Sequence, residues 1–272
     1  MNKTMIIAEV GINHNGNIEL AKKLIDVASA AGCDAVKFQK RDIESCYTSD
    51  ELNAPRKSPW GTTNREQKHG LEFGRTDYDE IDKYCERKQI QWFASPWDLI
   101  SINFLERYDS PFIKVPSARI NDIDFMKSCK NTDKGVIISS GMSDWTMVDR
   151  AVHTIEPLMV MQCTSTYPSQ PSELNLSVIQ KMCIRYPLQT IGFSNHNAGV
   201  IYMPIAVALG AKAIEFHITL DRAMYGSDQA ASIEPEGVFK LVKYIRGVEQ
   251  AMGNGEKFVY PSEAPIAAKL RR

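Results

Sequence analysis

Residues 190–196 read Thr-Ile-Gly-Phe-Ser-Asn-His, and residues 213–217 read Ala-Ile-Glu-Phe-His. Each stretch is a short apolar run that ends in a histidine, and the segment between them (200–210) is apolar and ends in glycine. This pattern predicts two parallel strands joined by a helix. Neighbouring strands lie about 4.8 Å apart, so His196 and His217 could share one metal ion at the same sheet edge. The alternative for a single histidine is an ordinary buried core residue.

The same alternation of apolar runs and helical periods extends along the whole chain. Strands are expected at 5–10, 35–39, 91–94, 112–115, 136–139, 158–162, 190–194 and 213–217. Helices are expected at 20–31, 77–88, 100–108, 123–130, 144–155, 174–186, 200–210 and 235–252. Eight strand–helix units in roughly 250 residues predict an α/β protein with a single-domain (β/α)₈ TIM barrel. An open doubly wound sheet is the alternative, but no Gly-x-Gly-x-x-Gly follows the first strand.

Two segments fall outside this alternation. Residues 41–74 form a long polar stretch, which we expect to be a lid or a wall of the site. The barrel domain is expected to span residues 1–260, and residues 261–272 to be a C-terminal tail or truncated linker with no further element.

Composition argues against several classes of protein. The 272 residues carry 32 Lys plus Arg against 33 Asp plus Glu, a net charge of −1, which argues against nucleic acid or a membrane as partner. The six cysteines include no Cys-x-x-Cys pair, as expected for reduced thiols in the cytoplasm, and Cys163 is expected to be a core residue. The N-terminus reaches a glutamate too early for a signal peptide.

Polar residues at the strand ends predict an anion site beside the histidines. Lys37 and Lys114 lie inside apolar runs, where a lysine must be paired, deprotonated or facing an anion. Serines follow several strands, so a phosphate or carboxylate pocket is expected; a buried ion pair with Glu9 is the structural alternative. Two histidines with oxygen ligands suit Mn²⁺ or Mg²⁺, which can polarise a carbonyl as a Lewis acid. The chemistry indicated is addition of a phosphorylated nucleophile to an aldehyde or ketone.

Several motifs carry a family resemblance. In chain order they are Ile-Ile-Ala-Glu-Val-Gly-Ile-Asn-His-Asn-Gly, Ala-Val-Lys-Phe-Gln-Lys, Ile-Ser-Ser-Gly-Met, Gln-Cys-Thr-Ser-Thr-Tyr-Pro, His-Ile-Thr-Leu-Asp and Gly-Ser-Asp. The whole chain resembles the barrel domain of the sialic acid (N-acetylneuraminate) synthases. The resemblance implies a cytoplasmic transferase that condenses phosphoenolpyruvate with the aldehyde of an N-acylhexosamine such as N-acetylmannosamine. The products would be a nine-carbon 2-keto-3-deoxy sugar acid and phosphate.

The resemblance also implies roles for individual residues. His196 and His217 match metal ligands, with Mn²⁺ expected and Mg²⁺ or Co²⁺ as alternatives. The residues expected to act in catalysis are Glu9, Lys37, Lys114 and Asp228, with Glu9 handling the proton of the attacking water. The residues expected to bind substrate are Gln39, Ser95, Ser117, Arg119, Ser139, Ser165, Tyr167 and Ser194.

The chain departs from the family pattern at several positions. Arg119 stands where these synthases commonly have an acidic residue, Ser165 replaces an asparagine, and Asn195 and Asn197 flank His196. The resemblance also implies a small antifreeze-like domain after the barrel; we expect this chain either to function without it, in which case a homodimer would use barrel surfaces, or to be a fragment of a longer protein. The alternatives to the synthase are a metal-dependent sugar-acid aldolase and a non-catalytic sugar-acid-binding barrel.

Overall fold

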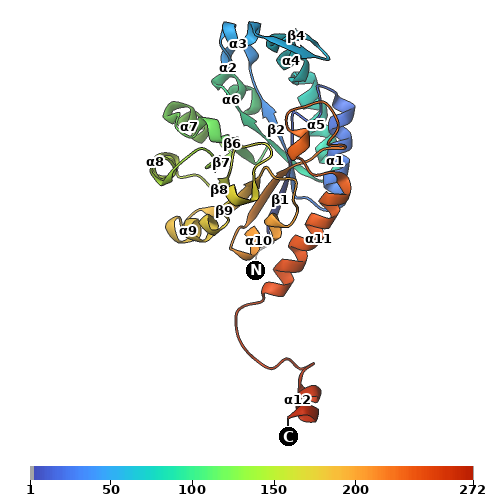
Figure 1. Ribbon diagram of the computed structural model, residues 1–272. Helices are drawn as coiled ribbons and strands as arrows, with labels where there is room; N and C mark the ends of the chain where they lie inside the picture. Colours follow the sequence, from blue (N-terminus) through green and yellow to red (C-terminus); the bar gives the residue numbers. More distant parts are fainter. Residues whose placement is uncertain (1–2, 272) are drawn as a thin grey trace.

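A closed barrel of eight parallel strands forms the centre of the computed structural model, which describes residues 3–271 (Figure 1). Around the barrel the strands follow the order β1-β10-β9-β8-β7-β6-β5-β2. Their bounds are β1 Met5–Gly11, β2 Ala35–Lys40, β5 Gln91–Pro96, β6 Phe112–Val115, β7 Gly135–Ser139, β8 Met159–Cys163, β9 Thr190–Asn195 and β10 Ala213–His217. The predicted TIM barrel is therefore confirmed, with strand bounds within two residues of those expected.

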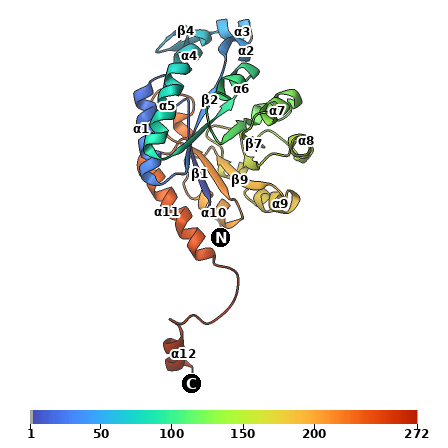
Figure 2. The same cartoon turned by 180° about the vertical axis from the view of Figure 1, so that it is seen from behind.

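Helices follow the strands and cover the outside of the barrel (Figures 1 and 2). They are α1 Ile18–Ala31, α5 Arg75–Lys88, α6 Leu99–Leu105, α7 Ile123–Lys130, α8 Trp145–Ile155, α9 Ser177–Arg185, α10 Tyr202–Ala208 and α11 Pro235–Met252. The first shows how the sequence sets their ends. The Asn17 side chain accepts the N–H groups of Glu19 and Leu20, and Gly32 ends the helix at φ 87°, a left-handed conformation that favours glycine.

The inward faces of the strands divide the barrel interior into an apolar end and a polar end. A small apolar cluster closes the N-terminal end and includes Ile7, Ala35, Phe93, Ile137 and Met161. Two residues later on the same strands, side chains on the same face are Glu9, Lys37, Ser95, Ser139 and Cys163. The apolar cluster therefore forms a floor, and the polar side chains stand above it at the C-terminal ends of the strands.

The long polar segment between β2 and α5 is folded rather than a single loop. It contains α2 Ile43–Cys46, α3 Ser49–Asn53, the hairpin of β3 Pro55–Ser58 with β4 Gly61–Thr63, and α4 Asn64–Leu71. Thr48 and Thr63 form capping boxes with Glu51 and Glu66, which explains how such short polar helices begin. Side chains of this segment line a cavity above the barrel, as expected for a wall of the site.

The C-terminal tail contains one more helix, α12 Ala264–Leu270, so the expectation of no further element there was wrong. The sequence Ala-Pro-Ile-Ala-Ala-Lys-Leu has high helix propensity and needs no apolar run to form a turn or two. The helix is largely exposed and extends away from the barrel (Figures 1 and 2). Within residues 3–271, no helix combines the length and apolar character needed to cross a membrane.

Candidate active site

A polar pocket opens at the C-terminal ends of the barrel strands. This inner pocket encloses a cavity of about 170 Å³. Its lining residues are Glu9, Lys37, Gln39, Ser95, Trp97, Lys114, Pro116, Ser117, Ala118, Ser139, Met142, Cys163, Ser165, Tyr167, Ser194, His196, Glu215 and His217. Strand register brings them together, since Glu9 pairs with both His217 and Lys37 across β1, and Glu215 pairs with Ser194.

Two buried ion pairs occupy the floor of the inner pocket. The Lys37 ammonium lies 2.7 Å from Glu9 Oε2 and donates to Ser95 Oγ at 3.2 Å. The Lys114 ammonium donates to Glu215 Oε1 at 2.6 Å. The ion pair with Glu9, the structural alternative for these lysines, is therefore present, and a second pair with Glu215 accompanies it. An ammonium has three donors, so one described partner leaves Lys114 with N–H groups for a ligand.

The pKa values of the four charged groups are shifted in different directions, two toward the charged form and two toward the neutral form. Burial lowers the pKa of Lys37, but the carboxylates of Glu215 and Glu9 outweigh burial and raise it overall. Burial opposes ionisation of Glu215, yet Lys114 and Lys37 lower its pKa to about 2. Burial lowers the pKa of Lys114 and raises that of Glu9, and in both cases the partner offsets only part of the effect. Glu9 and Lys114 are therefore the two groups whose pKa values are shifted toward the neutral form, so each can exchange a proton more readily than its ion-pair partner.

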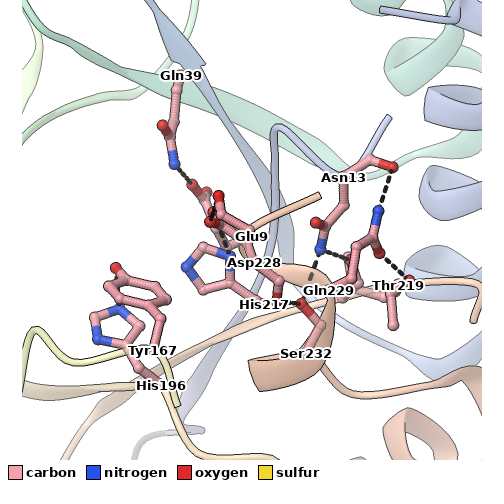
Figure 3. Close-up of polar contacts among 12 residues, drawn as sticks. Glu9, Asn13, Gln39, Tyr167, His196, His217, Thr219, Asp228, Gln229 and Ser232 are labelled. Atoms are coloured by element: carbon pink, nitrogen blue, oxygen red, sulfur yellow. Dashed lines mark hydrogen bonds and ion pairs between the residues drawn. The ribbon is translucent and has the colours of Figure 1, made fainter. Parts of the chain in front are cut away.

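His196 and His217 lie side by side at the pocket wall, with ring centroids 5.4 Å apart (Figure 3). Nδ1 of His196 lies 2.6 Å from the Thr164 carbonyl oxygen, which only accepts, so we assign the ring proton to Nδ1. Nε2 then accepts the Tyr167 hydroxyl at 2.8 Å, so a metal ion on this nitrogen would have to take the place of that hydroxyl. Burial lowers the pKa of His196, but the neighbouring Cys163 sulfur outweighs burial and raises it.

His217 is buried and lacks a hydrogen-bond partner at Nδ1. That nitrogen lies 3.6 Å from Asp228 Oδ2 (Figure 3). Burial lowers the pKa of His217 to about 4, and Asp228 offsets only part of the effect, so the imidazole is neutral near pH 7.

The donor set fits a divalent metal ion. A neutral imidazole with an unpartnered buried nitrogen and a second imidazole of fixed tautomer are typical ligands. Within residues 3–271, no three His, Cys, Asp or Glu side chains gather closely enough to enclose a metal. The two histidines would therefore leave positions for oxygen ligands from water or substrate, as hard divalent ions prefer.

A buried hydrogen-bond network holds the loop that carries Asp228. Gln229 Nε2 donates to the Asn13 carbonyl at 3.3 Å, and its Oε1 accepts the Thr219 hydroxyl (Figure 3). Asn13 Nδ2 donates to Ser232 Oγ at 2.8 Å, and that hydroxyl donates to the Asp228 carbonyl at 2.6 Å. The loop is thus tied to the ends of β1 and β10, and the Asp228 carboxylate faces His217.

The structure brings most of the predicted site residues together. All but two of them line the inner pocket. Asp228 lines an adjoining cavity, and Arg119 lies elsewhere, where it pairs with Asp122 at 2.8 Å and stacks on Phe125. Arg119, which the sequence predicted to bind substrate, is therefore held by contacts near the start of α7 instead of lining the pocket.

Several lining residues are absent from the predicted set. Glu215 stands two residues before His217, so the period of a strand places both on one face, and this signal could have found it. Cys163 is buried, as expected for a core residue, but it also lines the pocket. Burial raises its pKa, yet His196, with Nδ1 3.7 Å away, and Lys114 lower it to about 7. Trp97 and Met142 also line the pocket, but they are not charged or strongly polar, so a pattern of polar residues at strand ends does not indicate them.

Comparison with known proteins gives the same family over nearly the whole chain. A family model described as NeuB family matches residues 24–257. Human N-acetylneuraminate-9-phosphate synthase is 38% identical over 271 residues, which cover 97% of this chain and 76% of the human protein. N,N'-diacetyllegionaminic acid synthase of Legionella pneumophila is 34% identical over 279 residues, which cover 98% of this chain and 78% of that protein.

A solved structure shares the architecture. It is the N-acetylneuraminic acid (sialic acid) synthetase of Leptospira borgpetersenii in complex with citrate, which superposes with a TM-score of 0.87 at 30% identity. The superposition covers 100% of this chain and 93% of that one.

Proposed function

This chain belongs to the NeuB family, and we propose that it condenses phosphoenolpyruvate with the open-chain aldehyde of an N-acylhexosamine such as N-acetylmannosamine. The products would be a nine-carbon 2-keto-3-deoxy sugar acid and inorganic phosphate. The observation that supports this most strongly is the inner pocket, where two lysines and a ring of serines stand beside two histidines. A site that binds an anion next to an electrophile is what such a condensation requires.

The bond changes balance without any further reactant. C3 of phosphoenolpyruvate forms a bond to the aldehyde carbon, whose oxygen takes a proton. Water adds to C2 and gives up one proton, and the C2–O bond to phosphate then breaks as the new C2 hydroxyl becomes the ketone and passes its proton to the departing phosphate. Lys37 and Lys114 would bind the phosphate and carboxylate groups, with Ser95, Ser117, Ser139 and Ser194 as hydrogen-bond donors. We assign the proton of the water to Glu9, because burial raises the pKa of this carboxyl and it faces the pocket.

The acceptor sugar would lie between the histidines and the outer rim. Gln39 and Tyr167 line both the inner pocket and the cavity above it, and Asp228 stands beside His217. These three groups would orient the sugar hydroxyls. A divalent ion held by His196 and His217, Mn²⁺ by preference, would supply Lewis-acid polarisation of the aldehyde oxygen.

Release of phosphate tests the proposed reaction. Purified protein with Mn²⁺, phosphoenolpyruvate and an N-acylhexosamine should release phosphate and form a 2-keto acid in equal amounts. Lys114→Ala should lose most of this activity because the anion loses a direct partner. The proposal fails if no member of a panel of free and 6-phosphorylated N-acylhexosamines yields phosphate.

Metal binding is tested separately from turnover. Mn²⁺ titrated into chelator-treated protein should bind with about one ion per chain, measured by the loss of its free electron paramagnetic resonance signal. His217→Ala should weaken this binding at least tenfold, since one of two imidazole ligands is removed. His153→Ala is the matched control, because that histidine lies exposed on α8. Equal Mn²⁺ affinity in the two variants would refute the assignment of the ligands.

A further inference from the structure

Two segments far apart in the chain form the outer part of the site. A cavity of about 260 Å³ lies above the inner pocket and shares Gln39, Trp97 and Tyr167 with it. One side of this outer cavity comes from the segment between β2 and α5, and another side comes from Ser227 and Asp228 in the loop after β10. The width of the outer cavity therefore depends on how these two segments are held relative to each other.

Trp60, in the turn between β3 and β4, contacts the loop after β10 directly. Its indole ring meets the Tyr225 ring edge to face, with ring centroids 5.6 Å apart and an interplanar angle of 72°. Tyr225 lies in the same loop as Asp228, three residues before it. Within residues 3–271, neither ring belongs to the apolar core of the barrel. The contact therefore joins the two segments without filling the core.

Trp60 rests on a support that is fixed to the barrel. A Cβ atom at Gly70 would lie 2.1 Å from Cγ of Trp60, so the indole ring occupies the space that a side chain on α4 would fill. A Cβ atom at Gly16 would lie 1.9 Å from the Gly70 carbonyl oxygen, so the backbone of α4 lies against the turn between β1 and α1. Only glycine permits such close approaches of backbone and ring. The ring of Trp60 is thus held at a set position relative to β1.

Hydrogen bonds hold the backbone of Tyr225 and leave its ring to Trp60. Asn15 Nδ2 donates to the Tyr225 carbonyl oxygen at 2.9 Å, and Gln229 Nε2 donates to the same oxygen at 3.2 Å. Tyr225 is 38% exposed, so part of its side chain faces solvent. Removal of the indole ring would therefore loosen the loop without releasing it from the barrel.

We propose that Trp60 is a positioning residue for the acceptor sugar, which acts through Tyr225 to hold the loop that carries Asp228. The proposal rests on the proposed function, which places the acceptor between the histidines and the outer rim. Asp228 faces His217 at 3.6 Å, so a shift of the loop changes the acceptor side of the site. The lysines assigned to phosphoenolpyruvate belong to β2 and β6, away from this loop. Trp60 should therefore affect use of the acceptor and not use of phosphoenolpyruvate.

Kinetics with both substrates test the proposal, with the N-acylhexosamine that the wild type uses best as acceptor. Trp60→Ala should raise the KM for the acceptor roughly fivefold and the KM for phosphoenolpyruvate less than about twofold, because only the acceptor side loses its support. Trp60→Phe should recover most of the wild-type value, since a phenyl ring can still meet Tyr225 edge to face. Equal rises in both KM values, or no recovery in Trp60→Phe, would overturn the proposal.

Tyr225→Ala should reproduce the effect of Trp60→Ala, because either substitution removes the same contact. The double variant should then resemble the single variants, whereas independent roles would multiply the two effects to about twenty-five-fold. Tyr244→Ala is the matched control, because Tyr244 is 48% exposed on α11 and lines neither cavity. Multiplied effects in the double variant, or the same rise in Tyr244→Ala, would refute the role of the contact.

Limited proteolysis separates this proposal from the proposed function. Arg222 lies three residues before Tyr225 and its side chain is 50% exposed, so trypsin cleavage after it reports how often the loop opens. Cleavage after Lys257 in the exposed tail is the internal reference. Trp60→Ala and Tyr225→Ala should each be cleaved after Arg222 at least about threefold faster than the wild type, and Tyr244→Ala at the wild-type rate.

The two measurements fail independently. If no acceptor turns over, the condensation is wrong, and the cleavage rate after Arg222 still decides whether Trp60 holds the loop. Faster cleavage in Trp60→Ala and Tyr225→Ala supports the proposal. Cleavage at the wild-type rate in both variants refutes it.

Discussion

At the scale of single residues, the site depends on ionisable groups placed where water cannot reach them. Lys114 and Glu215 are almost fully buried and contact each other at 2.6 Å. Such a pair gains little over an apolar pair of the same size, but removing one partner leaves the other charge uncompensated. The pair is therefore better explained by the chemistry of the pocket than by the stability of the barrel.

Substitution of one partner should be more harmful than substitution of both. Lys114→Met is expected to lower the free energy of unfolding by about 3 kcal/mol, because Glu215 is left buried without its nearest cation. The double variant Lys114→Met/Glu215→Gln should recover part of that loss in denaturant titrations. A double variant as unstable as the sum of the two single variants would show that the residues do not compensate each other.

His14 makes stability depend on pH. Its ring stacks on Phe73 at 3.8 Å, and burial lowers its pKa from 6.5 to about 3. Below pH 6.5 the unfolded chain binds a proton that the folded chain does not, so stability from this group falls as pH decreases toward 3. From pH 7 to pH 5 the loss should be about 2 kcal/mol.

The comparison protein for this effect is His14→Gln, which keeps a side-chain acceptor for the Gly16 N–H. It should be less stable than wild type at pH 7 but should lose less stability between pH 7 and pH 5. Denaturant titrations at the two pH values measure the difference. The same pH-dependent loss in both proteins would contradict this assignment.

At the scale of elements, a hydrogen-bond network holds in place a loop that belongs to no strand or long helix. The loop after β10 carries Asp228, and Gln229 ties it to the end of β1 through the Asn13 carbonyl. Gln229 is 1% exposed and has no access to the pocket, so its influence on the site acts through the position of the loop.

Gln229→Leu should therefore impair use of the sugar more than use of phosphoenolpyruvate. We expect the KM for the acceptor to rise roughly tenfold because the loop that carries Asp228 is no longer held in position. The KM for phosphoenolpyruvate should change little. Thr132→Val is the control, since it removes a buried hydroxyl bond to the Cys129 carbonyl far from the site. A parallel change in both KM values would point to general loosening of the barrel instead.

The strand–helix order was predictable, because each barrel strand is a buried apolar run. The polar wall between β2 and α5 was harder to predict, since helices as short as α2 and α3 show no period. The ion pair between Arg119 and Asp122 could not be predicted from the sequence either, because it depends on the geometry of one 3₁₀ turn.

At the scale of the whole molecule, the barrel buries its core without help from the tail. The apolar side chains of α12, such as Ile266 and Leu270, are more than half exposed. A chain that ends after Met252 should keep its melting temperature within about 2 °C of the full chain, because little area buried on folding is lost. A fall of about 5 °C or more would mean that the tail covers part of the barrel.

In the proposed condensation, phosphate leaves from carbon and the three carbons of phosphoenolpyruvate join the sugar. Turnover in water enriched in ¹⁸O, followed by mass spectrometry of both products, tests it most directly. We predict unlabelled inorganic phosphate together with a sugar acid that contains three additional carbons. Labelled phosphate accompanied by free pyruvate would contradict the claim, because water would then have attacked phosphorus and no carbon–carbon bond would have formed.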